Sequence, residues 1–216
     1  MTCGWPNTSD PSALITSLRR QPLLAVLRPA TLTEARHQLQ QLQRAGLLHV
    51  ELAVRADPAW LEMARALVEE FPQLRLGAAS VCNSAALEAA MAAGLGYAVS
   101  PILDPQLLEQ AAVAGITLVP GVFSPSEVAA AVRWGAAAVK LYPATSLGPQ
   151  YWPSLSGPLG PLPFCIAAGG LSMVDVCPWI DAGVDAVALG STLFVAAGAE
   201  SRLQPGLPDL LGLLSS

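Results

Sequence analysis

The feature that most constrains the fold of this chain is a regular alternation of short apolar runs with longer amphipathic stretches. Alternating strands and helices are typical of a parallel sheet whose strands are joined by crossover helices. Strands are predicted at Leu23–Arg28, Leu48–Ala53, Leu74–Ala79, Gly96–Ser100, Thr117–Pro120, Ala137–Leu141, Phe164–Ala168 and Ala186–Leu189. Helices are predicted at Thr31–Ala45, Pro58–Phe71, Ser84–Ala93, Pro105–Ala114, Pro125–Trp134, Gln150–Ser156, Met173–Ala182 and Thr192–Ala197.

Capping signals support these boundaries. Asp57 and Asp104 each precede a proline, which pairs an N-cap side chain with a residue favoured at the first helical position. A glycine follows several predicted helices, at positions 46, 94, 115, 135 and 183. Glycine there takes the left-handed conformation that ends a helix.

Eight strand–helix units follow one another in 216 residues without a linker or a change of composition. This number indicates a closed parallel (β/α)₈ TIM barrel, at the small end of the size range for that fold. Residues 1–216 are predicted to form this single α/β domain, with a short helix before the first strand. A doubly wound open sheet is the alternative, but it usually has fewer strands, and no glycine-rich fingerprint follows the first predicted strand.

The composition argues against several classes of partner. The net charge is −5 with no cluster of basic residues, which argues against nucleic acid. Hydrophobic residues make up 53% of the chain, but no uninterrupted apolar run reaches the length of a membrane span. The N-terminus lacks a signal-peptide pattern, and Cys3, Cys82, Cys165 and Cys177 lack metal-site spacing. A cytoplasmic protein with reduced thiols, no metal and no membrane partner is expected.

Lys140 is the only lysine in the chain, which also has ten arginines. Arginine can replace lysine wherever only a positive charge is needed, but not where an amine must lose its proton. Lys140 lies in the apolar run 136–143, so it is a candidate for amine chemistry. The alternative is that one lysine has survived compositional drift by chance.

In barrels of this kind, chemistry is carried by residues at the carboxyl ends of the strands. Side chains alternate along a strand, so Glu51 shares a phase with Arg55, and Lys140 shares one with Tyr142. Buried charges are unfavourable unless they pair or serve chemistry. The polar groups at these ends are therefore expected to converge on one cavity.

Motifs at the strand ends carry a family resemblance from about residue 20 to 197. They are Val50-Glu51-x-x-x-Arg55, Gly77-Ala78-x-Ser80-Val81, Ser100-Pro101, Pro120-Gly121, Val139-Lys140-x-Tyr142-Pro143-Ala144, Gly169-Gly170-x-Ser172 and Leu189-Gly190-Ser191. Together they resemble the 2-keto-3-deoxy-6-phosphogluconate (KDPG) and 4-hydroxy-2-oxoglutarate (KHG) aldolases. The strand that ends in Arg28 and the segment 147–151 look closer to the phosphogalactonate branch.

The resemblance implies a class I aldolase without cofactor or metal, which works as a homotrimer. Such an enzyme cleaves 2-keto-3-deoxy-6-phospho sugar acids, of the gluconate or galactonate type, to pyruvate and glyceraldehyde 3-phosphate. It can also cleave 4-hydroxy-2-oxoglutarate to pyruvate and glyoxylate, and decarboxylate oxaloacetate. The small-molecule partner is thus a 2-keto acid.

Two residues are the catalytic candidates. Besides the N-terminus, Lys140 is the only amine able to form an iminium with a ketone. Desolvation and a nearby Arg55 or Arg28 would lower its pKa. By family analogy, Glu51 is the general acid–base. A structural carboxylate paired with Arg55 is the alternative for Glu51.

The substrate-binding candidates follow from the same resemblance. Arg55 and Arg28 compete for the substrate carboxylate and are not ranked, because either guanidinium suits it. Ser80, where the family usually has threonine, keeps a hydroxyl near the carboxylate or keto group, and Pro101 belongs to the Ser-Pro motif. Tyr142 either shields the imine or only packs in the core.

The last group of candidates would read the far end of the substrate. Ala168 stands where the phosphogluconate branch commonly has threonine, which leaves the C4 hydroxyl without a hydrogen bond. A phosphate site is expected at Gly169, Gly170, Gly190 and Ser191, because glycine lets backbone N–H groups approach an anion closely. The glycines could also serve only to make tight turns.

Two other classes of function stay open from the sequence. One is a non-aldolase phosphate-binding barrel, such as an isomerase or a thiamin-phosphate-synthase-like enzyme, in which Lys140 would be incidental. The other is a catalytically silent barrel that binds a keto acid or phosphate as a sensor.

Overall fold

The computed structural model describes residues 11–197 and 200–214 of the chain. Nine parallel strands form one sheet in the spatial order β5-β4-β3-β2-β1-β9-β8-β7-β6. The strands are β1 Leu23–Leu27, β2 His49–Ala53, β3 Arg75–Ala79, β4 Tyr97–Val99, β5 Thr117–Val119, β6 Gly121–Val122, β7 Ala138–Leu141, β8 Phe164–Ala168 and β9 Ala186–Leu189.

The two ends of this sheet are joined by the chain itself, so that the strands form a ring. β5 and β6 are separated only by Pro120, so the strand predicted at 117–120 continues past its predicted end to Val122. The carbonyl of Pro120 accepts a 2.8 Å hydrogen bond from the backbone N–H of Lys140, which ties this break to β7. The predicted (β/α)₈ TIM barrel is confirmed, and the open-sheet alternative is wrong.

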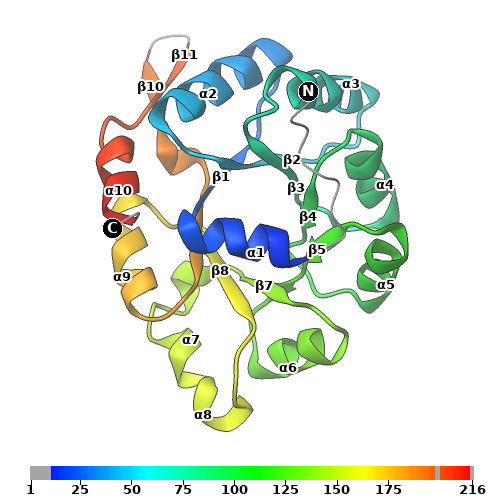
Figure 1. Ribbon diagram of the computed structural model, residues 1–216, viewed down its shortest axis with the longest axis vertical. Helices are drawn as coiled ribbons and strands as arrows, with labels where there is room; N and C mark the ends of the chain where they lie inside the picture. The colour runs from blue at the N-terminus through cyan, green and yellow to red at the C-terminus, as the bar shows by residue number, and fades with distance from the viewer. Residues whose placement is uncertain (1–10, 198–199, 215–216) are drawn as a thin grey trace.

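Helices surround the ring (Figure 1). Asp57 and Asp104 accept hydrogen bonds from backbone N–H groups of the helices they precede, and Gly46 and Gly115 end helices in the left-handed conformation, as predicted. The helices are α1 Pro11–Arg20, α2 Leu32–Ala45, α3 Pro58–Glu70, α4 Ser84–Ala92, α5 Pro105–Ala114, α6 Pro125–Arg133, α7 Tyr151–Ser154, α8 Ser156–Leu159, α9 Val176–Asp181 and α10 Leu207–Leu214.

The helix predicted at Thr192–Ala197 is wrong. Only a short 3₁₀ helix, η3 Ser191–Leu193, forms there, and it leads into the antiparallel hairpin of β10 Phe194–Ala197 and β11 Glu200–Leu203. Aromatic and β-branched residues such as Phe194 and Val195 favour an extended backbone. The hairpin is anchored on α2 by the side-chain oxygen of Gln41, which accepts a 2.8 Å hydrogen bond from the N–H of Leu203.

Two other predicted helices are broken up. The helix predicted at Gln150–Ser156 is two four-residue helices, α7 and α8, and the one predicted at Met173–Ala182 is the 3₁₀ helix η2 Met173–Asp175 followed by α9. Prolines lie inside both predicted ranges, at Pro153 and at Pro178, and proline has no N–H to donate to the preceding turn. The breaks therefore occur where the sequence removes helical hydrogen bonds.

The barrel interior forms its own hydrophobic cluster, distinct from the larger layer between strands and helices. Leu14 and Leu18 of α1 belong to this interior cluster. The helix lies across the ring of strands in Figure 1, and it immediately precedes β1. The Ser17 hydroxyl lies 2.8 Å from Nε2 of the buried His49. The predicted N-terminal helix is therefore present, and it seals the amino-terminal end of the barrel.

Within the described residues, no helix combines the length and the apolar content that a membrane crossing requires.

Candidate active site

A pocket of about 230 Å³ opens at the carboxyl ends of four neighbouring strands, β7, β8, β9 and β1. Four of its lining residues, Val26, Leu171, Ala188 and Thr192, were not among the predicted site residues. Eight were: Arg28, Lys140, Tyr142, Ala168, Gly169, Gly170, Gly190 and Ser191. The strand ends therefore bring together most of the residues that the sequence singled out.

Lys140 lies near the end of β7, with its backbone fixed between β6 and β8. Its side chain is buried, and its Nζ lies 5.2 Å from the centroid of the Tyr142 ring. Burial lowers the pKa of Lys140, Glu51 opposes this shift, and the positive charge of Arg28 lowers the pKa further. The pocket thus contains an amine that loses its proton more readily than an exposed lysine.

Glu51 lies in the middle of β2 and is only 1% exposed. Its Oε2 has no hydrogen-bond partner among the described residues. Burial raises the pKa of Glu51 to about 7, against the opposing charges of Lys140 and Arg28. Glu51 does not line the pocket itself, but its carboxyl is coupled to the two cations that do.

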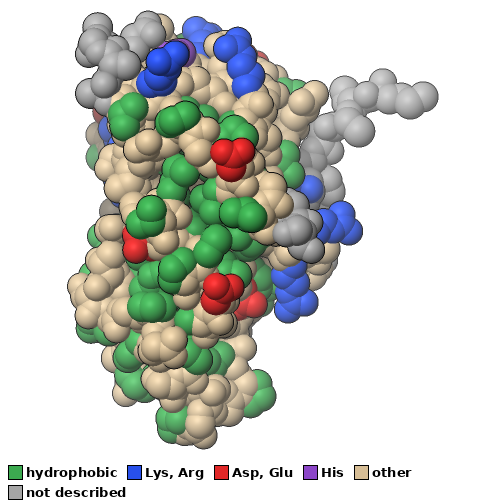
Figure 2. All heavy atoms as spheres, turned by 90° about the vertical axis from the view of Figure 1, so that its left-hand side faces the viewer, with side chains coloured by type: hydrophobic (Ala, Val, Ile, Leu, Met, Phe, Trp, Pro, Cys, Tyr) green, Lys and Arg blue, Asp and Glu red, His purple; other side chains and the backbone are tan. Residues whose placement is uncertain are grey.

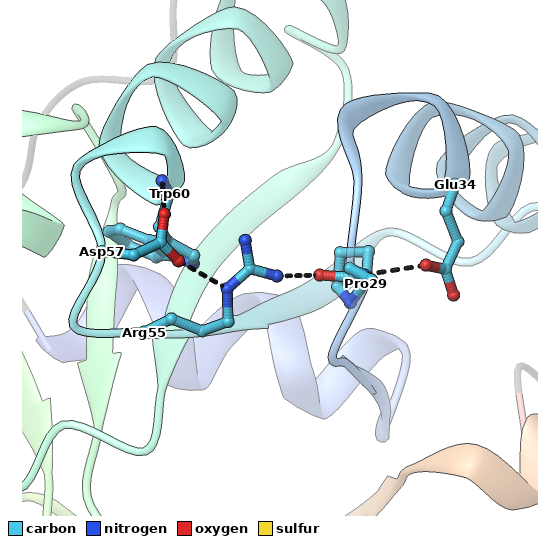
Figure 3. A network of polar contacts seen from close by, with 6 residues as sticks. Pro29, Glu34, Arg55, Asp57 and Trp60 are labelled. Carbon is cyan, nitrogen blue, oxygen red and sulfur yellow. Dashed lines mark hydrogen bonds and ion pairs between the residues drawn. The ribbon is translucent and has the colours of Figure 1, made fainter.

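Arg55 is held away from the pocket by partners of its own (Figure 3). Its Nε donates to Oδ2 of Asp57 at 2.9 Å, and its Nη1 donates to the carbonyl of Pro29. Asp57 also accepts a 3.0 Å bond from the N–H of Trp60 and so caps α3. Arg55 therefore joins the loops after β1 and β2. Its partners are thus Asp57 and Pro29, and the alternative pairing with Glu51 is not formed.

Arg28 directly follows β1, and its side chain lines the pocket. A methyl group at Gly190 would lie 3.9 Å from its Nη1. Its charge acts on the pKa of both Lys140 and Glu51, whereas that of Arg55 affects neither. Of the two competing arginines, Arg28 lines the pocket and Arg55 does not.

Ser80 and Pro101 lie outside the pocket lining. Ser80 follows β3 with φ +62°, an unusual conformation for a residue with a side chain. The backbone of Pro101 lies directly against Gly121, where any side chain would collide with it. Pro101 therefore packs against the strand that follows Pro120, and the structure gives neither residue a place in the pocket.

Gly169 and Gly170, after β8, both have positive φ, at +99° and +79°. A Cβ at Gly169 would lie 2.9 Å from ring atoms of Tyr142, and one at Gly170 would lie 2.7 Å from Oγ1 of Thr145. The same Oγ1 donates a 3.1 Å hydrogen bond to the carbonyl of Gly169. Both conformation and space thus require glycine here, and the turn also forms part of the pocket wall.

The four lining residues that were not predicted lie close to residues that were. Val26 and Ala188 lie two residues before Arg28 and Gly190, so strand alternation would have found them. The Thr192 hydroxyl donates a 2.9 Å hydrogen bond to the carbonyl of Leu171, which connects the turns after β8 and β9. No sequence signal marks this last contact.

Among the residues that the structure describes, no cluster of His, Cys, Asp or Glu is arranged to hold a metal ion. The pocket instead combines an amine, a guanidinium and exposed backbone at glycine turns. This set can bind an organic anion and form a covalent bond to a carbonyl carbon.

Comparison with known proteins agrees with this geometry. Residues 14–204 match the family model described as KDPG and KHG aldolase. The chain is 31% identical to 2-dehydro-3-deoxy-6-phosphogalactonate aldolase of Escherichia coli, over 84% of this chain and 88% of that protein. It is 32% identical to 2-dehydro-3-deoxy-phosphogluconate aldolase of Pseudomonas aeruginosa, over 81% of this chain and 79% of that protein.

A solved structure described as native KDPGal superposes with a TM-score of 0.74 at 28% identity, covering 90% of this chain and 91% of that one. Family, fold and pocket thus agree. The chain belongs to the KDPG and KHG aldolase family and is a carbon–carbon lyase.

Proposed function

We propose that the protein is a class I aldolase that cleaves 2-keto-3-deoxy-6-phospho sugar acids to pyruvate and glyceraldehyde 3-phosphate through a Schiff base on Lys140. One observation carries the proposal: the only lysine of the chain is buried in the pocket, with its pKa lowered. A neutral amine is the form that attacks a ketone. The names of the relatives support both the gluconate and the galactonate substrate.

The reaction follows from this placement. The Lys140 amine adds to the keto carbon, and loss of water gives the protonated imine. The C3–C4 bond then breaks, its electrons move into the imine to give an enamine, and the C4 hydroxyl loses its proton as the aldehyde leaves. Protonation of the enamine at C3 and hydrolysis release pyruvate and restore the amine.

Glu51 is proposed to move the protons in these steps. A general acid–base works best when its pKa lies near the working pH, and the pKa of Glu51 is raised to about 7. Because Glu51 lies behind the pocket lining, it acts through a water molecule. Its electrostatic coupling to Lys140 supports this role.

The remaining pocket residues are proposed to hold the two anionic ends of the substrate. Arg28 supplies the guanidinium for the carboxylate, since its charge reaches both Lys140 and Glu51. The backbone N–H groups of Gly169, Gly170, Gly190 and Ser191 suit the phosphate. Tyr142 shields the imine, because its ring already lies beside Nζ of Lys140.

The same imine would accept two further substrates. Cleavage of 4-hydroxy-2-oxoglutarate to pyruvate and glyoxylate uses the same C3–C4 step. Decarboxylation of oxaloacetate sends the electrons of the breaking carbon–carboxylate bond into the same acceptor. Both are proposed as side activities.

We also propose a cytoplasmic homotrimer. Figure 2 shows that hydrophobic side chains cover much of the face that bears α9 and α10. Val174 is 82% exposed and Leu213 is 68% exposed. Apolar surface of this kind favours a partner subunit. The free thiols of Cys82, Cys165 and Cys177 support the cytoplasmic location. Light scattering at micromolar concentration tests the assembly, and a monomer would contradict it.

The Schiff base is tested by borohydride reduction in the presence of pyruvate, followed by mass spectrometry of peptides. We expect one reduced pyruvyl group, on Lys140. Lys140→Arg keeps the charge but cannot condense with a ketone, so it should trap nothing and cleave nothing. Labelling only at the N-terminus, or sugar-acid cleavage by Lys140→Ala, would exclude the mechanism.

A further inference from the structure

Tyr97 is a buried polar residue inside the barrel that the proposed function does not use. Its side chain is 3% exposed and belongs to the interior cluster. Its hydroxyl oxygen is fully buried and has no hydrogen-bond partner among the described residues. A buried hydroxyl without a partner is unfavourable by about 1–3 kcal/mol, so this oxygen calls for an explanation.

The strand register places Tyr97 in the same layer of the barrel as Glu51. Glu51 on β2 pairs with Gly77 on β3. Ala78 on β3 pairs with Ala98 on β4, so one residue earlier Gly77 lies beside Tyr97. Neighbouring strands are about 4.8 Å apart, so the backbones of Glu51 and Tyr97 are separated by roughly 10 Å with only a glycine between them.

The ring of Tyr97 fills the space that Gly77 leaves. A Cβ at Gly77 would lie 2.5 Å from Cε2 and 2.6 Å from Cε1 of Tyr97. The nearest atom is Cζ, which carries the hydroxyl, so the hydroxyl end of the ring lies over β3, next to the strand that carries Glu51. Oε2 of Glu51 is the other buried oxygen of this layer without a hydrogen-bond partner in the described part of the chain.

The charges around Tyr97 and Glu51 determine the protonation state of each side chain. Lys140 on β7 and Arg28 after β1 face Glu51, and Arg75 on β3 acts on Tyr97. Burial, and then the charge of Glu51, raise the pKa of Tyr97 well above its ordinary value. The Tyr97 hydroxyl therefore stays protonated and can donate to the carboxylate.

His49 is a further titratable group near this layer, and its Nδ1 is buried without a hydrogen-bond partner among the described residues. His49 lies two residues before Glu51 on the same strand and bonds to Ser17 of α1. Burial and the charge of Arg75 lower the pKa of His49 to about 3, so it is neutral at working pH. Its hydrogen bond to α1 directs it toward the sealed end of the barrel.

We propose that Tyr97 is a positioning residue for Glu51, with its hydroxyl donating to the Glu51 carboxylate through a buried water molecule. The water is needed because the two oxygens are not in direct hydrogen-bond contact, yet both are buried and face the same layer. The inference rests on the proposed function, since it assigns Tyr97 to the group that moves protons. Tyr97 itself touches no reacting atom.

Tyr97→Phe tests the proposal, because it removes the hydroxyl and leaves the ring over Gly77. The readout is the pH dependence of the rate at which pyruvate exchanges its methyl protons with solvent. Donation to the carboxylate favours its charged form, so loss of the donor should raise the pKa of Glu51. We expect the acid limb of the exchange profile to move upward by about 0.4–1 pH unit.

Tyr151→Phe is the matched control. It removes a hydroxyl that donates to the carbonyl of Phe123 outside the barrel, and it should leave the acid limb unchanged. Thermal unfolding establishes that both variants are folded. A purely structural Tyr97 would change the unfolding temperature without moving the limb.

Borohydride trapping of pyruvate on Lys140 separates this inference from the proposed function. If Tyr97→Phe traps pyruvate and its acid limb stays at the wild-type pH, or moves downward, the positioning role is wrong and the aldolase mechanism stands. If wild type traps no pyruvate, the proposed function fails, and with it the role of Tyr97.

Discussion

Glu51 and Lys140 each oppose the pKa shift that burial causes in the other. Burial raises the pKa of Glu51 to about 7 and lowers that of Lys140, and each group's charge acts against the shift of the other. Burial outweighs this mutual opposition, so the carboxyl and the amine both titrate closer to neutral pH than exposed groups would. This pairing gives the proposed reaction an acid–base group and an available amine in one place.

Glu51→Gln is expected to bind pyruvate but to exchange its methyl protons about 10²- to 10⁴-fold more slowly, the range for a lost general base. In the wild type, exchange should rise with pH through about 7, as the carboxyl of Glu51 becomes the base. Proton NMR in deuterated buffer measures both. Undiminished exchange by the variant would assign the proton transfer to another group.

The same variant should change how stability depends on pH. The folded protein keeps the proton of Glu51 up to about pH 7, whereas the unfolded chain releases it near 4.5. The stabilisation from this group is therefore complete below pH 4.5 and is lost as the pH rises through 7. Wild type should lose about 3 kcal/mol relative to Glu51→Gln between these limits. Urea unfolding at pH 4 and 8 measures the difference, and a pH-independent difference would contradict the shift.

Arg28→Ala and Arg55→Ala should separate the two arginines. Arg28 lines the pocket, so its loss should lower kcat/KM about 10- to 100-fold, as expected for a hydrogen bond to a charged group. Arg55 is bonded to Asp57 and Pro29, so its loss should mainly lower the stability. Steady-state kinetics measures kcat/KM of the two variants, and thermal unfolding measures their stability. A larger kinetic defect in Arg55→Ala would reverse the assignment.

Ala168 should leave the enzyme poorly selective between the gluconate and galactonate epimers. It is buried in the pocket wall and offers no side-chain hydrogen bond to a C4 hydroxyl. One neutral hydrogen bond is worth about 0.5–1.5 kcal/mol, a factor of a few to tenfold. Both epimers should be cleaved, with galactonate at least comparable, and Ala168→Thr should shift kcat/KM toward gluconate. A wild-type preference for gluconate above about a hundredfold would mean that another residue reads C4.

Gly77→Ala should destabilise the protein by about 1–3 kcal/mol, because the added methyl group would overlap the ring of Tyr97. Gly157→Ala is the control, since Gly157 lies in α8 with open space around its Cβ position. Denaturant unfolding of the two variants measures the contrast. Equal stability of both would show that the Tyr97 ring can move aside.

The sequence predicted the barrel well because its signals are local and repeated. Strand ends could be read in order, and eight of the twelve residues chosen there line one pocket. It could not rank Arg28 against Arg55, since β2 ends at Ala53 and strand alternation no longer fixes a side chain beyond that point. The direction of Arg55 is set by Asp57 and the Pro29 carbonyl, the second of which comes from another loop.

The hairpin after β9 was missed for a related reason. Residues 192–197 are compatible with either a helix or a strand, and pairing with β11 and anchoring on α2 decide between them. The role inferred for Tyr97 is invisible in the sequence for the same reason, because it depends on a glycine in the neighbouring strand. Both features depend on contacts between segments that are distant in the sequence, and a local sequence pattern does not show such contacts.

Helix α1 packs into one end of the barrel, whereas the pocket lies at the other end, where Gly170 and Ser191 are exposed. Lys140 lies deeper, at 6% exposure. In the proposed mechanism, a sugar acid attached to Lys140 would therefore carry its phosphate outermost. If the proposed Schiff base forms, pyruvate stays bonded to Lys140 at the inner end, so the aldehyde leaves first and pyruvate last, and in the synthetic direction pyruvate binds before its aldehyde partner.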